Sequence, residues 1–94
     1  MSVVWTPEAR DDPSRISAYI EGQNIGAARR VVQRIVSATE RLADHPAIGR
    51  PGRVGGTREL VVLPTPYVVA YRVLDGQVEV IRVLHSARCW PDLF

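Results

Sequence analysis

Two valine-rich runs on either side of Asp75-Gly76 constrain the fold of this chain more than any other feature. An Asp-Gly pair between alternating apolar residues is a strong signal for a tight β-hairpin turn. The flanking runs, Tyr67 to Leu74 and Gln77 to Leu84, have the composition of strands, and a third such run, Thr57 to Leu63, precedes them. Because the connecting loops are short, these runs predict an antiparallel meander of three strands.

Alternation in the last run assigns its side chains to two faces of the sheet. We expect one face to carry Val78, Val80, Arg82 and Leu84, and the other to carry Glu79, Ile81, Val83 and His85. An arginine beside apolar neighbours needs a partner, and for Arg82 the candidate is Glu59 on a neighbouring strand.

The first part of the chain predicts a short strand and a helix. Ser2 to Trp5 has strand composition, and Thr6 is a suitable N-cap for a helix from about Pro7 to Glu21. Pro13 falls inside this helix, where a proline costs about 3 kcal/mol, so we expect a distortion close to it.

A second helix is predicted from Ile25 to Ala43, where apolar residues recur three and four positions apart. The glycine- and proline-rich segment from Asp44 to Gly56 predicts a loop, with Ile48 and Val54 holding it to the core. The whole order predicts an α+β fold, β-α-α-β-β-β, in which a helical hairpin packs on an antiparallel sheet. We expect residues 1–94 to form a single domain.

Composition excludes several classes of protein. No apolar run reaches the roughly 18 residues of a membrane-spanning helix. The N-terminus lacks the pattern of a signal peptide, so a cytoplasmic location is expected. Cys89 is the only cysteine and no Cys/His cluster accompanies it, so we expect neither a metal nor a cofactor.

The distribution of charge points to an anionic partner. All 12 basic residues are arginines, and seven of them lie between residues 29 and 58, against two acidic residues in the same stretch. A basic segment of this kind suits either nucleic acid or an acidic protein segment.

Four segments in sequence order carry a resemblance to a known family: WTPEAR, ERLADHPAIGRPGR, PYVVAYRV and VEVIRVLHSARCWP. Together they resemble the opening strand, the loop after the second helix, the central hairpin and the tail of the RelE/ParE toxin superfamily. The resemblance implies the toxin of a bacterial type II toxin–antitoxin system, silenced by a ParD-like antitoxin. It implies no sequence-specific DNA binding by this chain alone.

Members of this superfamily differ in their target, and the resemblance is closer to the ParE-like branch. RelE-like members cut mRNA on the ribosome, and they place an arginine after the aromatic residue that begins the second meander strand. Here Val68 follows Tyr67, and the chain has no lysine. We therefore expect a ParE-like inhibitor of DNA gyrase; the incomplete ribonuclease set favours a non-enzymatic toxin but leaves the question of enzymatic activity open.

Two alternatives stay open, a ribosome-dependent endoribonuclease and a non-toxic interaction module derived from the family. A ribonuclease would need an acid, a base and cations, and the candidates are Arg58, Arg72, Arg82, His85 and Arg88. For binding of the target or the antitoxin the candidates are Arg29, Arg30, Arg34, Arg53, Arg58, His85, Arg88 and Trp90.

Overall fold

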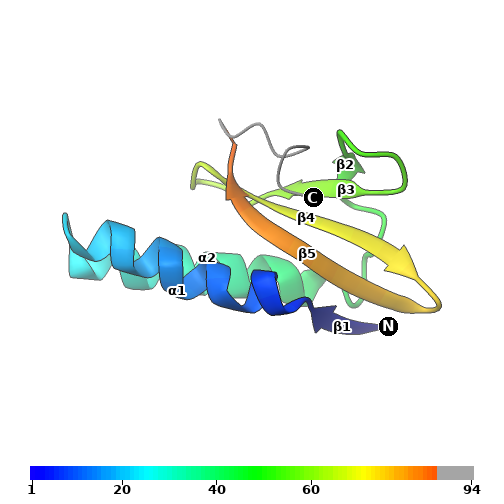
Figure 1. Ribbon diagram of the computed structural model, residues 1–94, viewed down its shortest axis with the longest axis horizontal. Coiled ribbons are helices and arrows are strands. Elements are labelled where there is room, and N and C mark those ends of the chain that lie inside the picture. The colour runs from blue at the N-terminus through cyan, green and yellow to red at the C-terminus, as the bar shows by residue number, and fades with distance from the viewer. Residues whose placement is uncertain (87–94) are drawn as a thin grey trace.

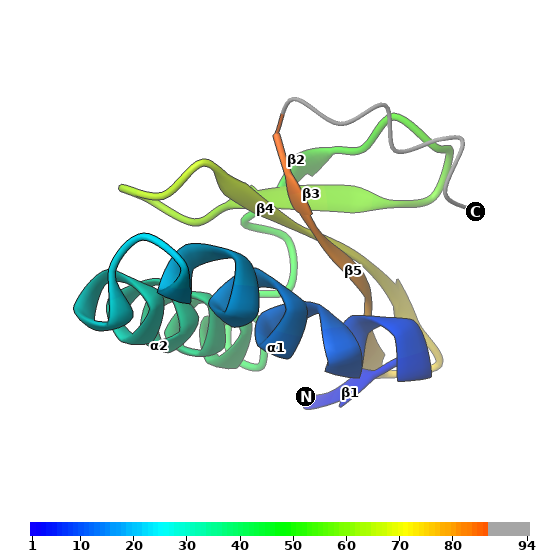
Figure 2. The same cartoon turned by 60° about the vertical axis from the view of Figure 1, so that its left-hand side comes forward.

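The structure is a computed structural model, and it describes residues 1–86 as a helical hairpin on one face of a five-stranded sheet (Figures 1 and 2). In chain order the elements are β1 (Ser2–Trp5), α1 (Pro7–Glu21), α2 (Ile25–Arg41), β2 (Arg50–Pro51), β3 (Arg58–Val61), β4 (Tyr67–Leu74) and β5 (Gln77–His85). The predicted order of strands and helices is confirmed, with β2 as an addition inside the predicted loop. Neither helix in residues 1–86 is long and apolar enough to cross a membrane.

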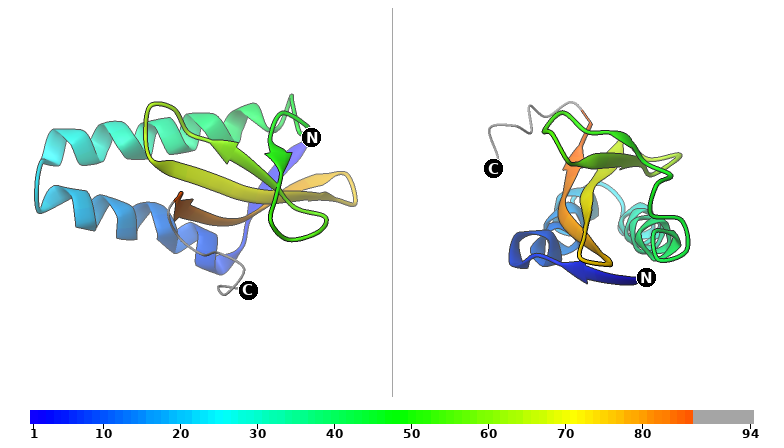
Figure 3. Two further views of the ribbon diagram at one scale, coloured as in Figure 1. Left: turned by 90° about the horizontal axis from the view of Figure 1, so that it is seen from above. Right: turned by 90° about the vertical axis from the view of Figure 1, so that its right-hand side faces the viewer.

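The sheet is mixed, with the strand order β1-β5-β4-β3-β2. The predicted meander is confirmed, because β3, β4 and β5 pair antiparallel. The sheet as a whole is not antiparallel, since β1 pairs parallel to β5. The two helices lie side by side beneath the sheet and return the chain to the side on which it started (Figure 3).

The alternation predicted for β5 holds only as far as Val80. A register shift between β4 and β5 leaves Ile81 as a bulge residue. Beyond the bulge, Val83 lies in the core that also contains Val80, whereas Leu84 belongs to a separate cluster. The predicted placing of Arg82 and Leu84 on the face of Val80 is therefore wrong, because a period of two residues does not reveal a bulge.

Where β1 ends, the start of helix α1 continues the hydrogen bonding along the same edge of β5. The Thr6 backbone N–H donates to the Val80 carbonyl at 3.0 Å, and the Thr6 hydroxyl donates to the Ile81 carbonyl at 2.9 Å. Six residues later, a carboxylate oxygen of Asp12 accepts the backbone N–H of Val83 at 2.8 Å. Side chains of the helix therefore supply hydrogen bonds that a neighbouring strand would otherwise supply.

The predicted bounds of the first helix are confirmed. Helix α1 runs from the Thr6 cap to Gly22 and is not broken at Pro13. A proline at this position removes the hydrogen bond to the Ala9 carbonyl. Packing on the sheet and the contacts of Asp12 with β5 stabilise the helix there, since tertiary contacts supply most helical stability in proteins.

Tyr71 fastens the loop after α2 to the sheet. Its side chain is fully buried, and its hydroxyl donates to the Pro46 carbonyl at 2.8 Å and accepts the Gly49 N–H at 2.9 Å. Of the two residues predicted to hold this loop, Val54 packs against a buried cluster, whereas Ile48 is 42% exposed. The prediction for Ile48 is wrong, because the phenol, not an apolar side chain, holds this part of the loop.

We expect the Tyr71→Phe variant to be less stable by about 1–3 kcal/mol near pH 7, because it leaves the buried Gly49 N–H without its acceptor. Burial raises the pKa of Tyr71 above its ordinary 10.0. The contribution of the neutral phenol to folding stability is therefore complete below pH 10 and is lost as the pH rises through the pKa of Tyr71 in the folded protein. Chemical denaturation between pH 7 and strongly alkaline pH should therefore give a shallower alkaline decline for Tyr71→Phe. The exposed Tyr19→Phe is the control, and equal slopes for the two variants would contradict the assignment.

Candidate functional site

Arg82 is held by Asp12, not by Glu59 as predicted. Its Nε donates to one oxygen of Asp12 at 2.9 Å and an Nη donates to the other at 3.1 Å. Asp12 is 2% exposed and Arg82 is 15% exposed, so this ion pair is largely shielded from water. The hydrogen bonds that Arg82 donates to Asp12 raise the pKa of Arg82 above its ordinary value. Arg82 is therefore part of the joint between α1 and β5.

Two further ribonuclease candidates are also engaged within the fold. An Nη of Arg58 donates to the Gly49 carbonyl at 2.7 Å and to the Ala47 carbonyl at 3.4 Å, which ties β3 to the loop after α2. Arg72 pairs with Glu79 across the β4–β5 hairpin at 2.8 Å. Neither guanidinium is directed toward the other candidates.

His85 lies at the end of β5, against the ring of Tyr67. The two ring centroids are 5.6 Å apart and the planes are nearly perpendicular. Burial raises the pKa of the Tyr67 phenol. Both residues line a groove of about 660 Å³ between α1 and the end of β5, to which Arg15 and Tyr19 contribute exposed side chains.

The predicted ribonuclease candidates do not all converge on one site: Arg82 and His85 line the groove between α1 and the end of β5, whereas Arg58 and Arg72 lie elsewhere on the sheet. His85 is paired with Tyr67 at the start of β4, and Arg72 lies five residues further along the same strand, about 17 Å away at the rise of a strand. Arg58 is paired with Tyr71, so it and Arg72 lie on opposite faces of the sheet. Arg88 lies outside the described residues, as does Trp90, predicted for partner binding.

Glu59 is a buried acid that organises two arginines on β2 and the following loop. It is 3% exposed, and its oxygens lie 3.2 Å from Arg50 and 3.8 Å from Arg53. Arg53 also donates to the Ser86 carbonyl at 3.5 Å. Arg53 and Arg58, both predicted to bind a partner, thus have contacts within the fold. Counting charges along the sequence does not reveal these contacts.

The arginines of α2 differ from those of the sheet. Within residues 1–86 their side chains make no ion pair and no hydrogen bond, and all of them are exposed. They are Arg29, Arg30, Arg34 and Arg41. The predicted binding residues Arg29, Arg30 and Arg34 are therefore available to a partner, and Arg41 is a further one that was not singled out from the sequence.

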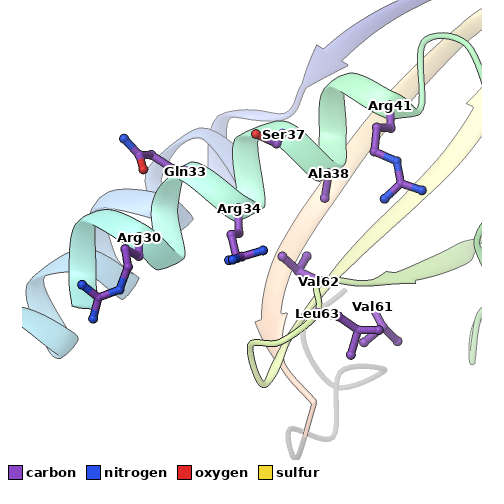
Figure 4. Close-up of a pocket in the computed structure, with 9 residues that line it drawn as sticks. All are labelled: Arg30, Gln33, Arg34, Ser37, Ala38, Arg41, Val61, Val62 and Leu63. Atoms are coloured by element: carbon purple, nitrogen blue, oxygen red, sulfur yellow. The ribbon is translucent and has the colours of Figure 1, made fainter. Parts of the chain in front are cut away.

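Three of these arginines border a groove between α2 and the end of β3, which we call the α2–β3 groove (Figure 4). Its volume is about 440 Å³, and its lining contains no acidic residue. The lining residues are Arg30, Gln33, Arg34, Ser37, Ala38 and Arg41 on one side and Val61, Val62 and Leu63 on the other. Leu63 is 75% exposed and Val61 is 39% exposed. The groove therefore combines apolar surface with positive charge.

The chemistry of this groove differs from that of a metal centre. Among residues 1–86, no three His, Cys, Asp or Glu side chains are grouped closely enough to hold a metal ion. Arginine-bordered apolar surfaces suit acidic, partly apolar protein segments.

The sequence of the chain matches the family model for the ParE toxin of type II toxin–antitoxin systems (parDE) over residues 3–90. The chain belongs to the ParE toxin family. It is similar to the putative toxin Y4kP of Sinorhizobium fredii, with 45% identity over 95% of this chain and 92% of the relative. It is also similar to toxin RelE2 of Caulobacter vibrioides, with 43% identity over 92% of this chain and 96% of that one.

Solved structures agree with this membership of the ParE family. A chain of the chromosomal ParDE system from P. aeruginosa superimposes with a TM-score of 0.80 at 28% identity, over 90% of this chain and 95% of that one. A chain of the RelBE2 toxin–antitoxin complex from Mycobacterium tuberculosis shares the fold, with a TM-score of 0.65 at 24% identity, over 89% and 95% of the two chains. The names of these relatives belong to both branches of the superfamily, so family membership leaves the cellular target of this ParE-family toxin open.

Proposed function

We propose that this ParE-family toxin acts by protein–protein contact with DNA gyrase and is neutralised by a ParD-like antitoxin. The family match and the ParDE structural neighbour support this branch. The observation that carries the proposal is the dispersal of the ribonuclease candidates: Arg58, Arg72 and Arg82 each bind a different group of the fold.

The chemistry of RNA cleavage explains why this dispersal matters. Attack by a 2′-hydroxyl needs a base, an acid and cationic donors gathered around one phosphate. Arg82 donates two hydrogen bonds to Asp12, and these bonds would have to be broken before Arg82 could bind a phosphate. Breaking a shielded ion pair costs several kcal/mol, so Arg82 is unsuited to this role.

Charge supports the antitoxin partner. The arginines of α2 have no acidic partner within residues 1–86, and like charges on one helix repel each other. An acidic segment would relieve this repulsion and speed association. The neighbouring structures are toxin–antitoxin systems, which is consistent with such a partner.

A ribosome-dependent endoribonuclease is the second candidate function. The names of two Caulobacter relatives, RelE2 and RelE3, favour it. The exposed His85 is the residue through which this activity would act, because a histidine can transfer protons near neutral pH.

A single set of assays on purified toxin separates the candidates. We expect the toxin to inhibit supercoiling by gyrase and to leave ribosome-bound mRNA intact. The His85→Ala variant should inhibit gyrase as well as the unchanged toxin does, because contact with gyrase needs no proton transfer by the exposed imidazole. Cleaved mRNA with unaffected gyrase, abolished by His85→Ala, would establish the ribonuclease. Normal growth at confirmed expression, with neither activity, would point to the non-toxic interaction module.

A further inference from the structure

The groove between α1 and the end of β5, which we call the α1–β5 groove, is larger than the α2–β3 groove. Its volume is about 660 Å³, and small-molecule sites typically occupy roughly 300–1,000 Å³. Figure 3 shows β5 ending beside α1. The linings of the two grooves share no residue, so the α1–β5 groove is a separate place on the molecule.

The edge of β5 that faces this groove is already bonded by α1. The Thr6 hydroxyl donates to the Ile81 carbonyl at 2.9 Å, and Asp12 accepts the Val83 N–H at 2.8 Å. An added strand needs unpaired backbone groups of this kind, and both of these are taken. The groove therefore suits a ligand that binds through side chains, not an extended protein segment.

Apolar and aromatic side chains make up most of the lining. Ile16 and Val83 are buried, whereas the ring of Tyr19 is exposed. The ring of Tyr67 meets that of His85 edge to face, with the centroids 5.6 Å apart. A flat aromatic ligand would bury its faces against such side chains, which favours an aromatic ring over a wholly polar ligand.

The hydroxyl of Tyr67 is a polar group without a partner at this site. Tyr67 is only 7% exposed, yet its hydroxyl makes no hydrogen bond within residues 1–86. In that part of the chain no fully buried side-chain oxygen or nitrogen lacks a partner, so this hydroxyl opens into the groove. Burial, and after it the nearby Tyr19, raise the pKa of Tyr67. The phenol is therefore protonated at neutral pH and offers a donor to a ligand.

Two guanidinium groups share one carboxylate in the lining. Oδ1 of Asp12 accepts from Arg15 at 3.0 Å and from Arg82 at 3.1 Å, and Oδ2 accepts from Arg82 at 2.9 Å. Asp12 is the only acidic residue among the described residues of the lining. Glu8, exposed on the same helix, acts on Arg82 from outside the groove. The lining itself thus has one more positive charge than negative charge.

Arg15 is the residue that can offer this charge to a ligand. Its side chain is 62% exposed and makes one hydrogen bond within residues 1–86, to Asp12. A guanidinium has five N–H donors, so most of them are available. Hydrogen bonds from these donors to an ionised acid are charge-assisted and stronger than bonds to a neutral group.

We infer that the α1–β5 groove is a binding site for a small aromatic anion, a flat ring that carries a carboxylate or phosphate group. The ring packs against Tyr19 and the apolar lining, Arg15 binds the acidic group, and the Tyr67 hydroxyl supplies a second donor. This site goes beyond the proposed function, and it stands or falls independently of the contacts with gyrase and the antitoxin.

Titration of the isotope-labelled toxin with indole-3-acetate, followed by NMR, tests this inference. The probe joins a flat ring to a carboxylate; indole-3-acetamide has the same ring without the charge, and acetate has the charge without the ring. We expect saturable shifts of the Tyr67 and Val83 amides, with the Val61 and Leu63 amides of the other groove unchanged. The acid should bind at least about threefold more tightly than the amide, and acetate should not saturate below about 10 mM.

Two variants assign the binding groups. Arg15→Gln should weaken indole-3-acetate at least about threefold and leave indole-3-acetamide unchanged, and Arg10→Gln is the matched control, an exposed arginine of the same helix outside the lining. Tyr67→Phe keeps the ring against His85 and loses only the hydroxyl, so it should weaken indole-3-acetate at least about twofold. The spectrum of each free variant shows whether it is folded.

Several results would overturn the inference. They are the absence of saturable shifts up to about 10 mM indole-3-acetate, shifts centred on the α2–β3 groove, and equal affinities for the acid and the amide. Equal effects of Arg15→Gln and Arg10→Gln would do the same. The comparison of acid with amide uses the unchanged toxin, so it decides even if a variant does not fold.

Discussion

The Asp12→Ala variant is expected to lose about 3–5 kcal/mol of folding free energy, a large part of what a domain of this size has. The substitution leaves Arg82, only 15% exposed, without its counter-charge, and leaves the buried Val83 N–H without an acceptor. It also detaches α1 from the edge of β5 next to Pro13, where the helix lacks one of its own hydrogen bonds.

Chemical denaturation of the purified variants measures this effect. Asp11→Ala is the matched control, because Asp11 is the exposed neighbour of Asp12 on the same helix. Asp12→Asn should lie between the two, since an amide oxygen still accepts the Val83 N–H but carries no charge for Arg82. In cells, the loss should appear as reduced abundance of the protein. An Asp12→Ala variant as stable as Asp11→Ala would show that the joint is unimportant.

Local sequence signals predicted the elements well, because each signal acts over a few residues. The bounds of β1, α1 and β4 are confirmed to the residue, and Asp75 adopts the positive φ that its turn requires. The predicted cap at Thr6 is also confirmed, since N-capping needs only one side-chain oxygen and a nearby N–H.

Features that depend on distant residues were not accessible from the sequence. The bulge at Ile81 and the parallel pairing of β1 with β5 arise only when the sheet assembles. The role of Asp12 was also hidden, because its partner Arg82 lies 70 residues away. For the candidate site the same limit applied: the charge distribution pointed to the arginines of α2, but the pairing of Glu59 with Arg50 and Arg53 did not follow from the sequence.

The Gly49→Ala variant is expected to lose about 2–5 kcal/mol, combining overpacking with the loss of a buried hydrogen bond. A Cβ at this position would lie 2.6 Å from the Tyr71 hydroxyl, 2.7 Å from its ring and 3.0 Å from the Glu59 carbonyl. The loop cannot shift outward without giving up the bond of Arg58 to the Gly49 carbonyl. Gly55→Ala, with open space around its Cβ, is the control and should be nearly neutral.

A double-mutant cycle shows whether the clash with Tyr71 is the cause. In the Tyr71→Phe background the hydroxyl contact and its hydrogen bond with Gly49 are already absent, so Gly49→Ala should cost less there. Contact with the ring remains, so the cost should not vanish. Strictly additive effects in thermal or chemical unfolding would mean that the loop relaxes away from Tyr71.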